Sequence, residues 1–278
     1  MEDTFELLIT NILRLSGLSE SQIQKDDENM IKIKQAFVHK SYDLINNELL
    51  AVKGHNLIKY LIGLFINEKF PNISTPFQYS AMICKFQESK NYTQIALNLN
   101  LDTYIKYDPL NCKIWNRGKL NCDFTETKEY FEICGDVFVS LCYVLSKFIN
   151  CNKFIDYCFS NLNISVDYEN LVSPITRLNN LYNHIGIEER QRTRYFNIKT
   201  RDEYYDSKYE NFTGEKIPID SRIIGFGYVY DKNSFKLISA IAGISKNQIK
   251  DQVARELLSY YESINIKLEI PDTWVKII

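Results

Sequence analysis

One long apolar stretch, residues 36–66, constrains what this chain can fold into more than any other feature. From Asn47 onward, apolar residues recur at spacings of three, four and seven positions, which is the period of a helix with one buried face. They are Leu50, Leu57, Ile58, Leu61, Ile62 and Phe65. Glu48, Ala51 and His55 form a second stripe on another face, because they stand at positions i, i+3 and i+7. We therefore expect a core helix that also presents a short row of side chains.

Composition and charge restrict the class of protein. The chain has 278 residues, of which 24% are charged and 45% are hydrophobic, and these values are typical of a soluble globular protein of one or two domains. The formal net charge of −2 provides no general attraction for nucleic acid. Any RNA binding therefore requires a local basic patch.

Targeting and cysteine patterns give an expectation about location. The N-terminal residues Met1–Thr4 are acidic and lack the pattern of a signal or transit peptide. No apolar run approaches the roughly 20 residues of a membrane span, so we expect no membrane association. The 7 cysteines include no C-x-x-C pair and no metal-ligand spacing, and we expect reduced core thiols. We expect a cytoplasmic protein, or a mitochondrial one if a transit peptide has been removed.

The apolar periodicity and the helix breakers predict a helical N-terminal half. Gly17 ends the first helix, and Phe70 with Pro71 ends the long one. A polar insertion, Asp108–Glu126, precedes the last group of helices. The expected helices cover residues 3–18, 31–40 and 47–70, two short segments within 77–106, and 133–145 with a continuation over 147–163.

Three stretches of this half resemble signatures of the ribonuclease III family. Residues 36–42 (Ala-Phe-Val-His-Lys-Ser-Tyr) are similar to a family helix that reads "hydrophobic-T-H-R/K-S-Y". Residues 47–55 (Asn-Glu-Leu-Leu-Ala-Val-Lys-Gly-His) are similar to "N-E-R-L-E-F-L-G-D", and residues 133–145 resemble the "GDxFESLxGAIY" helix of the Dicer branch. The flanking residues match in order and spacing. The resemblance implies the all-helical fold of that family.

The resemblance also implies the positions of a metal site, most of whose ligands have changed. In the family, four carboxylates on two crossing helices hold Mg²⁺, which activates water for attack on a phosphodiester. The matching positions here are Ala51, His55, Asp136 and Val139, so one carboxylate remains. Mg²⁺ prefers six oxygen ligands, and imidazole is a poor substitute. We therefore expect no catalysis and no metal cofactor.

Several alternatives remain open around this site. A partner subunit that supplied ligands would make the chain a divergent, Mg²⁺-dependent endoribonuclease that cuts double-stranded RNA. His55 would act as a general base or bind a softer metal only with Asp136 as its neighbour; otherwise it fills the former metal cavity. Glu48 matches a family residue near the RNA and the dimer surface, and a solvated helix residue explains it equally well. His39 matches a structural position.

The C-terminal half resembles a double-stranded-RNA-binding domain with the element order α-β-β-β-α. Residues 173–181 are similar to its opening "DPKTxLQEL" helix, and residues 242–258 to its closing "GxSKKxAKxxAAxxAL" helix. A charged insertion, Arg201–Asp220, is longer than usual, and the "GPxH" loop of that domain is absent. Alternating apolar positions predict three strands between the helices, over Thr193–Lys199, Ile223–Asp231 and Phe235–Ala242.

This second resemblance implies which residues contact RNA. Such a domain reads the A-form shape through its first helix, and lysines at the start of its last helix meet the phosphates. The matching positions are Lys246, Asn247 and Lys250 on the last helix, with Thr176, Asn179, Asn180 and Asn183 on the first. A domain that kept its fold only to dock onto protein is the alternative.

Together these features predict an all-α ribonuclease III-like domain and a small α+β domain of the double-stranded-RNA-binding type. The expected boundaries are 1–165 for the first domain, 166–174 for a linker, 175–266 for the second domain and 267–278 for a C-terminal tail. Such a protein would bind structured or double-stranded RNA without cutting it, in a ribonucleoprotein or RNA-processing complex. We expect a homodimer or heterodimer that forms through the helix at residues 47–62.

Overall fold

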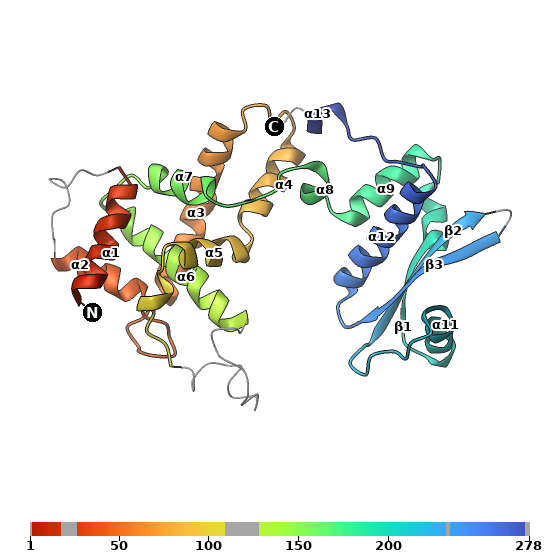
Figure 1. Ribbon diagram of the computed structural model, residues 1–278, viewed down its shortest axis with the longest axis horizontal. Helices are drawn as coiled ribbons and strands as arrows, with labels where there is room; N and C mark the ends of the chain where they lie inside the picture. Colours follow the sequence, from red (N-terminus) through yellow and green to blue (C-terminus); the bar gives the residue numbers. More distant parts are fainter. Residues whose placement is uncertain (1, 18–26, 109–127, 232–233, 276–278) are drawn as a thin grey trace. The chain divides into compact units, whose positions relative to one another are not determined.

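The chain divides into two compact units, the first ending at Ser165 and the second comprising Val166–Val275. It is mostly helical, and the second unit contains a small three-stranded antiparallel sheet. The structure is a computed structural model (Figure 1), and it describes residues 2–17, 27–108, 128–231 and 234–275.

The first unit consists of helices packed around α3 and α6. α6 packs against both α3 and α5, and the buried side chains of these three helices form much of the core. The helices in chain order are α1 (Glu2–Leu15), α2 (Asp27–Ala36), α3 (Glu48–Lys69), α4 (Pro76–Phe86), α5 (Ser89–Asn98), a 3₁₀ turn over Asp102–Tyr104, α6 (Lys128–Leu145) and α7 (Asn152–Ser160).

Local sequence explains where several of these helices begin and end. Gly17, two residues beyond α1, has φ of +84°, a conformation that favours glycine. Thr75 and Gln78 form a capping box at the start of α4, where Pro76 occupies the first turn. The polar insertion expected at Asp108–Glu126 lies almost entirely outside the described residues.

The signature segment that was expected to be helical leaves the helix at Ala36. Backbone hydrogen bonds join this segment to residue 106: the Lys106 N–H donates to the Phe37 carbonyl at 2.8 Å, and the His39 N–H donates to the Lys106 carbonyl at 2.9 Å. Asn47 closes the loop, because its side-chain amide donates to the Ala36 carbonyl at 3.1 Å. Tertiary hydrogen bonds thus replace the next helical turn.

Helix α3 also corrects the expectation about apolar length. With 22 residues, it is the described helix whose length and composition alone would suit a membrane span. Its apolar face is buried within the helical unit through Ile58, Ile62 and Ile66, none of which is exposed. A core helix of a folded domain has the same length and composition, so the helix is weak support for a membrane segment.

The second unit combines helices with the sheet. Strands β1, β2 and β3 pair in that order, each antiparallel to its neighbour. Its elements are α8 (Tyr168–Leu171), α9 (Pro174–His184), a 3₁₀ turn over Glu189–Gln191, α10 (Arg192–Tyr195), β1 (Phe196–Thr200), α11 (Glu203–Thr213), β2 (Ile223–Asp231), β3 (Ser234–Gly243), α12 (Lys246–Ser263) and α13 (Asp272–Val275).

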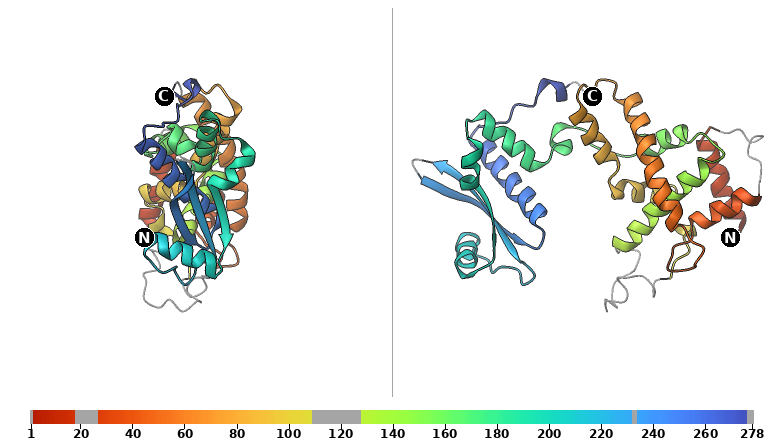
Figure 2. Two further views of the ribbon diagram at one scale, coloured as in Figure 1. Left: turned by 90° about the vertical axis from the view of Figure 1, so that its right-hand side faces the viewer. Right: turned by 180° about the vertical axis from the view of Figure 1, so that it is seen from behind.

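Helices cover both faces of this sheet (Figures 1 and 2). One face packs against α9 and α12 through a core that includes Leu178, Val253 and Leu257. The other face packs against α11 through a second core that includes Tyr209 and Phe226. Side chains that alternate along β2 therefore enter two different cores.

Close packing of α12 explains two glycines in β2. A Cβ on Gly225 would lie 2.4 Å from a methyl group of Ile249, and a Cβ on Gly227 would lie 2.9 Å from Leu257. Both positions therefore require glycine for the helix to approach the strand. A bulge between Gly227 and Tyr228 shifts the register with β3.

Four segments of this unit contain structure that the sequence did not predict. The insertion Arg201–Asp220 contains α11, and the first residues of the run Thr193–Lys199 belong to the helical turn α10. The stretch expected as a linker contains α8, and the expected tail contains α13. The rings of Tyr168 and Trp274 meet edge-on at 5.4 Å between their centroids, which joins these two short helices.

Candidate functional site

The four positions that the resemblance aligns with metal ligands come together where α3 packs across α6. Ala51 and Val139 are buried, with exposed fractions of 5% and 0%. His55 and Asp136 lie at the surface, with side chains 48% and 45% exposed, and His55 Nε2 is 3.4 Å from Asp136 Oδ1. The structure thus places two of the positions in the core and pairs the other two.

An aromatic wall supports the His55 side of this pair. The rings of His55 and Tyr92 are 5.9 Å apart, and Tyr92 in turn contacts Phe138 at 6.1 Å. Burial raises the pKa of the Tyr92 phenol, which keeps it neutral. The imidazole therefore rests against an apolar ring and a single carboxylate.

The residues at this crossing do not fit Mg²⁺. One carboxylate and one imidazole provide too few oxygen ligands for an octahedral hard cation. Ala51 and Val139 offer no ligand atom, and they are packed too tightly for solvent to take their place. In the part of the chain that the structure describes, no group of three or more His, Cys, Asp or Glu side chains could hold a metal ion.

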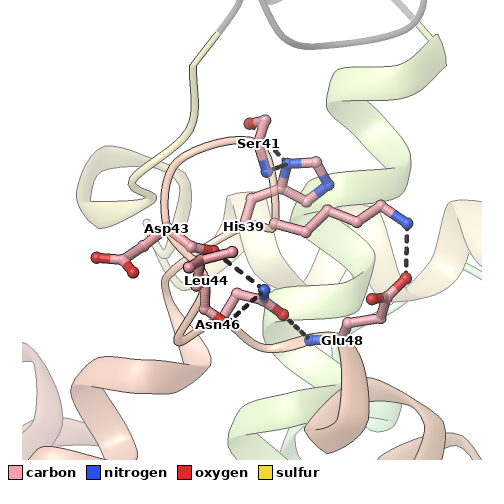
Figure 3. A network of polar contacts seen from close by, with 7 residues as sticks. His39, Ser41, Asp43, Leu44, Asn46 and Glu48 are labelled. Atoms are coloured by element: carbon pink, nitrogen blue, oxygen red, sulfur yellow. Dashed lines mark hydrogen bonds and ion pairs between the residues drawn. The ribbon is translucent and has the colours of Figure 1, made fainter.

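The loop before α3 is held by its own polar network (Figure 3). His39 Nδ1 lies 2.9 Å from Ser41 Oγ, and Glu48 accepts a hydrogen bond of 2.7 Å from the Lys40 ammonium. Burial is the main cause that lowers the pKa of His39, and Lys40 adds to it. His39 is therefore held within this network, and Glu48 is engaged with Lys40.

The face of α3 on which dimerisation was predicted exposes apolar side chains. Leu49 and Val52 are 63% and 58% exposed, and Leu44 in the preceding loop is 98% exposed. Lys53 on the same helix lies over the ring of Tyr143, at 5.6 Å from its centroid. The patch is therefore apolar with a cation at one edge.

The lysines at the start of α12 have different environments. Lys246 and Asn247 are exposed in the first turn, which Ser245 caps by accepting the Gln248 N–H. Lys250 is half-buried.

Contacts within the unit engage all four of the α9 residues that were predicted to bind RNA. The Asn180 amide donates to the Tyr168 hydroxyl at 3.1 Å, and Thr176 Oγ1 lies 2.9 Å from Ser173 Oγ. Asn179 and Asn183 each accept a hydrogen bond from the guanidinium of Arg192. These side chains are thus anchored within the unit.

Arg192 is the residue of this region that the sequence interpretation missed. It begins α10, and it lies on α9 through the contacts with Asn179 and Asn183. One signal in the sequence was available, since arginines alternate at positions 190, 192 and 194. Such a run is a local basic patch in a chain without net positive charge.

Comparisons with known proteins give one match in sequence. Over 78 residues the chain is 31% identical to "Ribonuclease 3" from Histophilus somni (strain 2336). This match covers 28% of the chain and 34% of that protein, so the chain matches about a third of the relative's length. No protein-family model matches the chain.

Two solved structures show only a distant likeness. The nuclease domain of ribonuclease III from Campylobacter jejuni is 21% identical with a TM-score of 0.37, over 49% of this chain and 85% of that one. Dicer from Pichia stipitis is 13% identical with a TM-score of 0.34, over 83% of this chain and 93% of that one.

Proposed function

We propose that this chain is a ribonuclease III-like protein that binds structured or double-stranded RNA without cleaving it. The observation that carries the proposal is the packing of Ala51 and Val139 in the core where α3 crosses α6. Two former ligand positions have thereby become part of the hydrophobic interior. No metal cofactor is needed in this function.

The loss of ligands removes the chemistry of cleavage. Phosphodiester hydrolysis by a metal ion needs an activated water and a cation that neutralises the developing charge. The pair of His55 and Asp136 cannot replace such a cation, since its side chains supply one carboxylate and one imidazole 3.4 Å apart. A partner subunit would have to insert its carboxylates past the buried Val139 to rebuild the site.

RNA binding is assigned to the second unit. Its element order contains an α-β-β-β-α frame made of α9, the three strands and α12. Lys246 and Lys250 stand at the N-terminal end of α12, where the helix dipole adds to their charge. Phosphate contacts of this kind favour the A-form shape of RNA over any particular base sequence.

Association of two chains through α3 belongs to the same proposal. Leu49 and Val52 provide an exposed apolar surface, and exposed apolar clusters mark interaction sites. The Lys53 ammonium at its edge favours a partner that carries a complementary acid at that position. We therefore propose a homodimer or heterodimer that forms through the helix at residues 47–62, in a cytoplasmic ribonucleoprotein or RNA-processing complex.

The test combines cleavage and binding on the same purified protein. We expect retention of a 30-base-pair RNA duplex at low salt and no cleavage products with Mg²⁺ or Mn²⁺. Metal-dependent cutting that disappears in Asp136→Ala would contradict the non-catalytic assignment and favour the endonuclease. Equal affinity for duplex RNA and duplex DNA would instead indicate that the second unit docks onto protein.

A further inference from the structure

We propose that Arg192 is the centre of an oxyanion site on the second unit, which takes a phosphate of a nucleic acid backbone. The inference rests on the proposed RNA binding for the identity of that phosphate. It also reverses the roles expected from the sequence, because Asn179 and Asn183 become positioning residues for Arg192.

The two asparagines hold the guanidinium in one orientation. Asn179 and Asn183 are one turn apart on α9, and the oxygen of each side-chain amide accepts from a different terminal nitrogen of Arg192. The Asn179 contact measures 3.3 Å. A planar guanidinium held at two points loses little further freedom when it binds a ligand.

The hydrogen-bond inventory of Arg192 leaves donors for a ligand. A guanidinium has five N–H groups. Asn179 and Asn183 each accept a hydrogen bond from one N–H, on a different terminal nitrogen. The Nε–H is buried without a partner among the described residues. One N–H remains on each terminal nitrogen, and charged donors of this kind suit the oxygens of a phosphate.

The charge of Arg192 is not neutralised within the described part of the chain. Its hydrogen-bond partners are neutral amides, and it forms no ion pair with a described carboxylate. The neighbouring acid Glu188 is engaged instead with Arg190, at 2.5 Å. The positive charge of Arg192 therefore lies beside α9, the helix where RNA contact was predicted, and an oxyanion is the complementary ligand.

The test uses the full-length protein and a 20-base-pair RNA duplex of mixed sequence, with affinity measured by fluorescence anisotropy at several salt concentrations. Arg192→Gln should weaken RNA binding about tenfold. It should also reduce the slope of log affinity against log salt concentration by about one unit. Arg194→Gln is the matched control, because Arg194 is exposed and its side chain makes no hydrogen bond or ion pair with another described residue. Arg194→Gln removes an identical charge two positions along the chain, and we expect it to change the affinity for RNA by less than about threefold.

The positioning role is tested by a double-mutant cycle. The change Asn179→Ala plus Asn183→Ala should weaken binding in the wild-type background and have little further effect in Arg192→Gln. Equal effects in the two backgrounds would show that the asparagines contact RNA themselves. Equal losses in Arg192→Gln and Arg194→Gln would show that only net charge matters, and either result overturns the proposal.

A titration with pyrophosphate separates this inference from the proposed function. The side-chain amide NMR signals of Asn179 and Asn183 should shift in the wild-type protein and stay in place in Arg192→Gln. Such shifts in a protein that binds no duplex RNA would support the oxyanion site and contradict RNA binding. The absence of a difference between wild type and Arg192→Gln would contradict the oxyanion site, whether or not RNA binds.

Discussion

Gly54 of α3 lies directly against the backbone of Val139 on α6: a Cβ on Gly54 would stand 2.2 Å from the Val139 carbonyl oxygen. The contact joins the two helices that carry Ala51 and His55 on one side and Asp136 and Val139 on the other. Because the obstacle is backbone, no rotation of a side chain can relieve it. This glycine therefore sets the distance between α3 and α6.

The first prediction concerns this contact. Gly54→Ala should lower the free energy of unfolding by about 1–3 kcal/mol, since overpacking forces the two helices apart. Chemical denaturation measures the change. Gly135→Ala is the matched control in α6, where the added Cβ would meet its nearest neighbour at an ordinary 3.5 Å. That variant should be neutral or more stable by up to about 1 kcal/mol, because alanine favours a helix.

The second prediction concerns the restoration of a family carboxylate. Val139→Glu should destabilise the protein by about 3–5 kcal/mol above neutral pH, because the new carboxylate would be buried without a partner. Burial raises the folded-state pKa of such a group, so the loss should grow as pH rises above about 4.3 and be smallest in acid. Val139→Gln, which cannot ionise, should show the same stability deficit at pH 5 and pH 8 in urea unfolding.

The third prediction uses the lowered pKa of His39, which burial causes first and Lys40 second. The folded state binds a proton on this imidazole less readily than the unfolded state. Its contribution to stability is therefore complete above about pH 6.5 and declines as pH falls below that value. His39→Gln should flatten the dependence of unfolding free energy on pH between 7 and 5. His184→Gln, at an exposed position of the other unit, should leave that dependence unchanged.

The fourth prediction concerns the lysines of α12. The change Lys246→Ala plus Lys250→Ala should weaken binding to unrelated RNA duplexes by similar factors, because phosphate contacts carry no sequence information. The slope of log affinity against log salt should flatten by roughly two units at most. Loss of affinity for one duplex and not for another would contradict shape-based recognition. Circular dichroism should show an intact fold, with a larger stability loss expected for the half-buried Lys250 alone than for Lys246 alone.

The sequence by itself determined the long helices and the strands, because each carries a strong period. The apolar spacing after Asn47 predicted α3, and alternation over Ile223–Asp231 predicted β2 with the bounds that the structure has. It also determined which atoms are available at the positions that align with the metal ligands of the family, since the side chains of Ala51 and Val139 have no ligand atom in any fold. Side-chain chemistry is a property of the residue and needs no tertiary information.

Only the tertiary structure decided which side chains meet and how far each is buried. Nothing local shows that Val38 leaves the helix to bridge Lys106, because the competing hydrogen bond comes from a residue distant in the chain. In the same way, Arg192 donates hydrogen bonds to the side-chain oxygens of Asn179 and Asn183 only when α10 is packed against α9. Helix α11 was not predicted because its apolar stripe is short. The helix is stabilised by packing on the sheet face opposite α9 and α12.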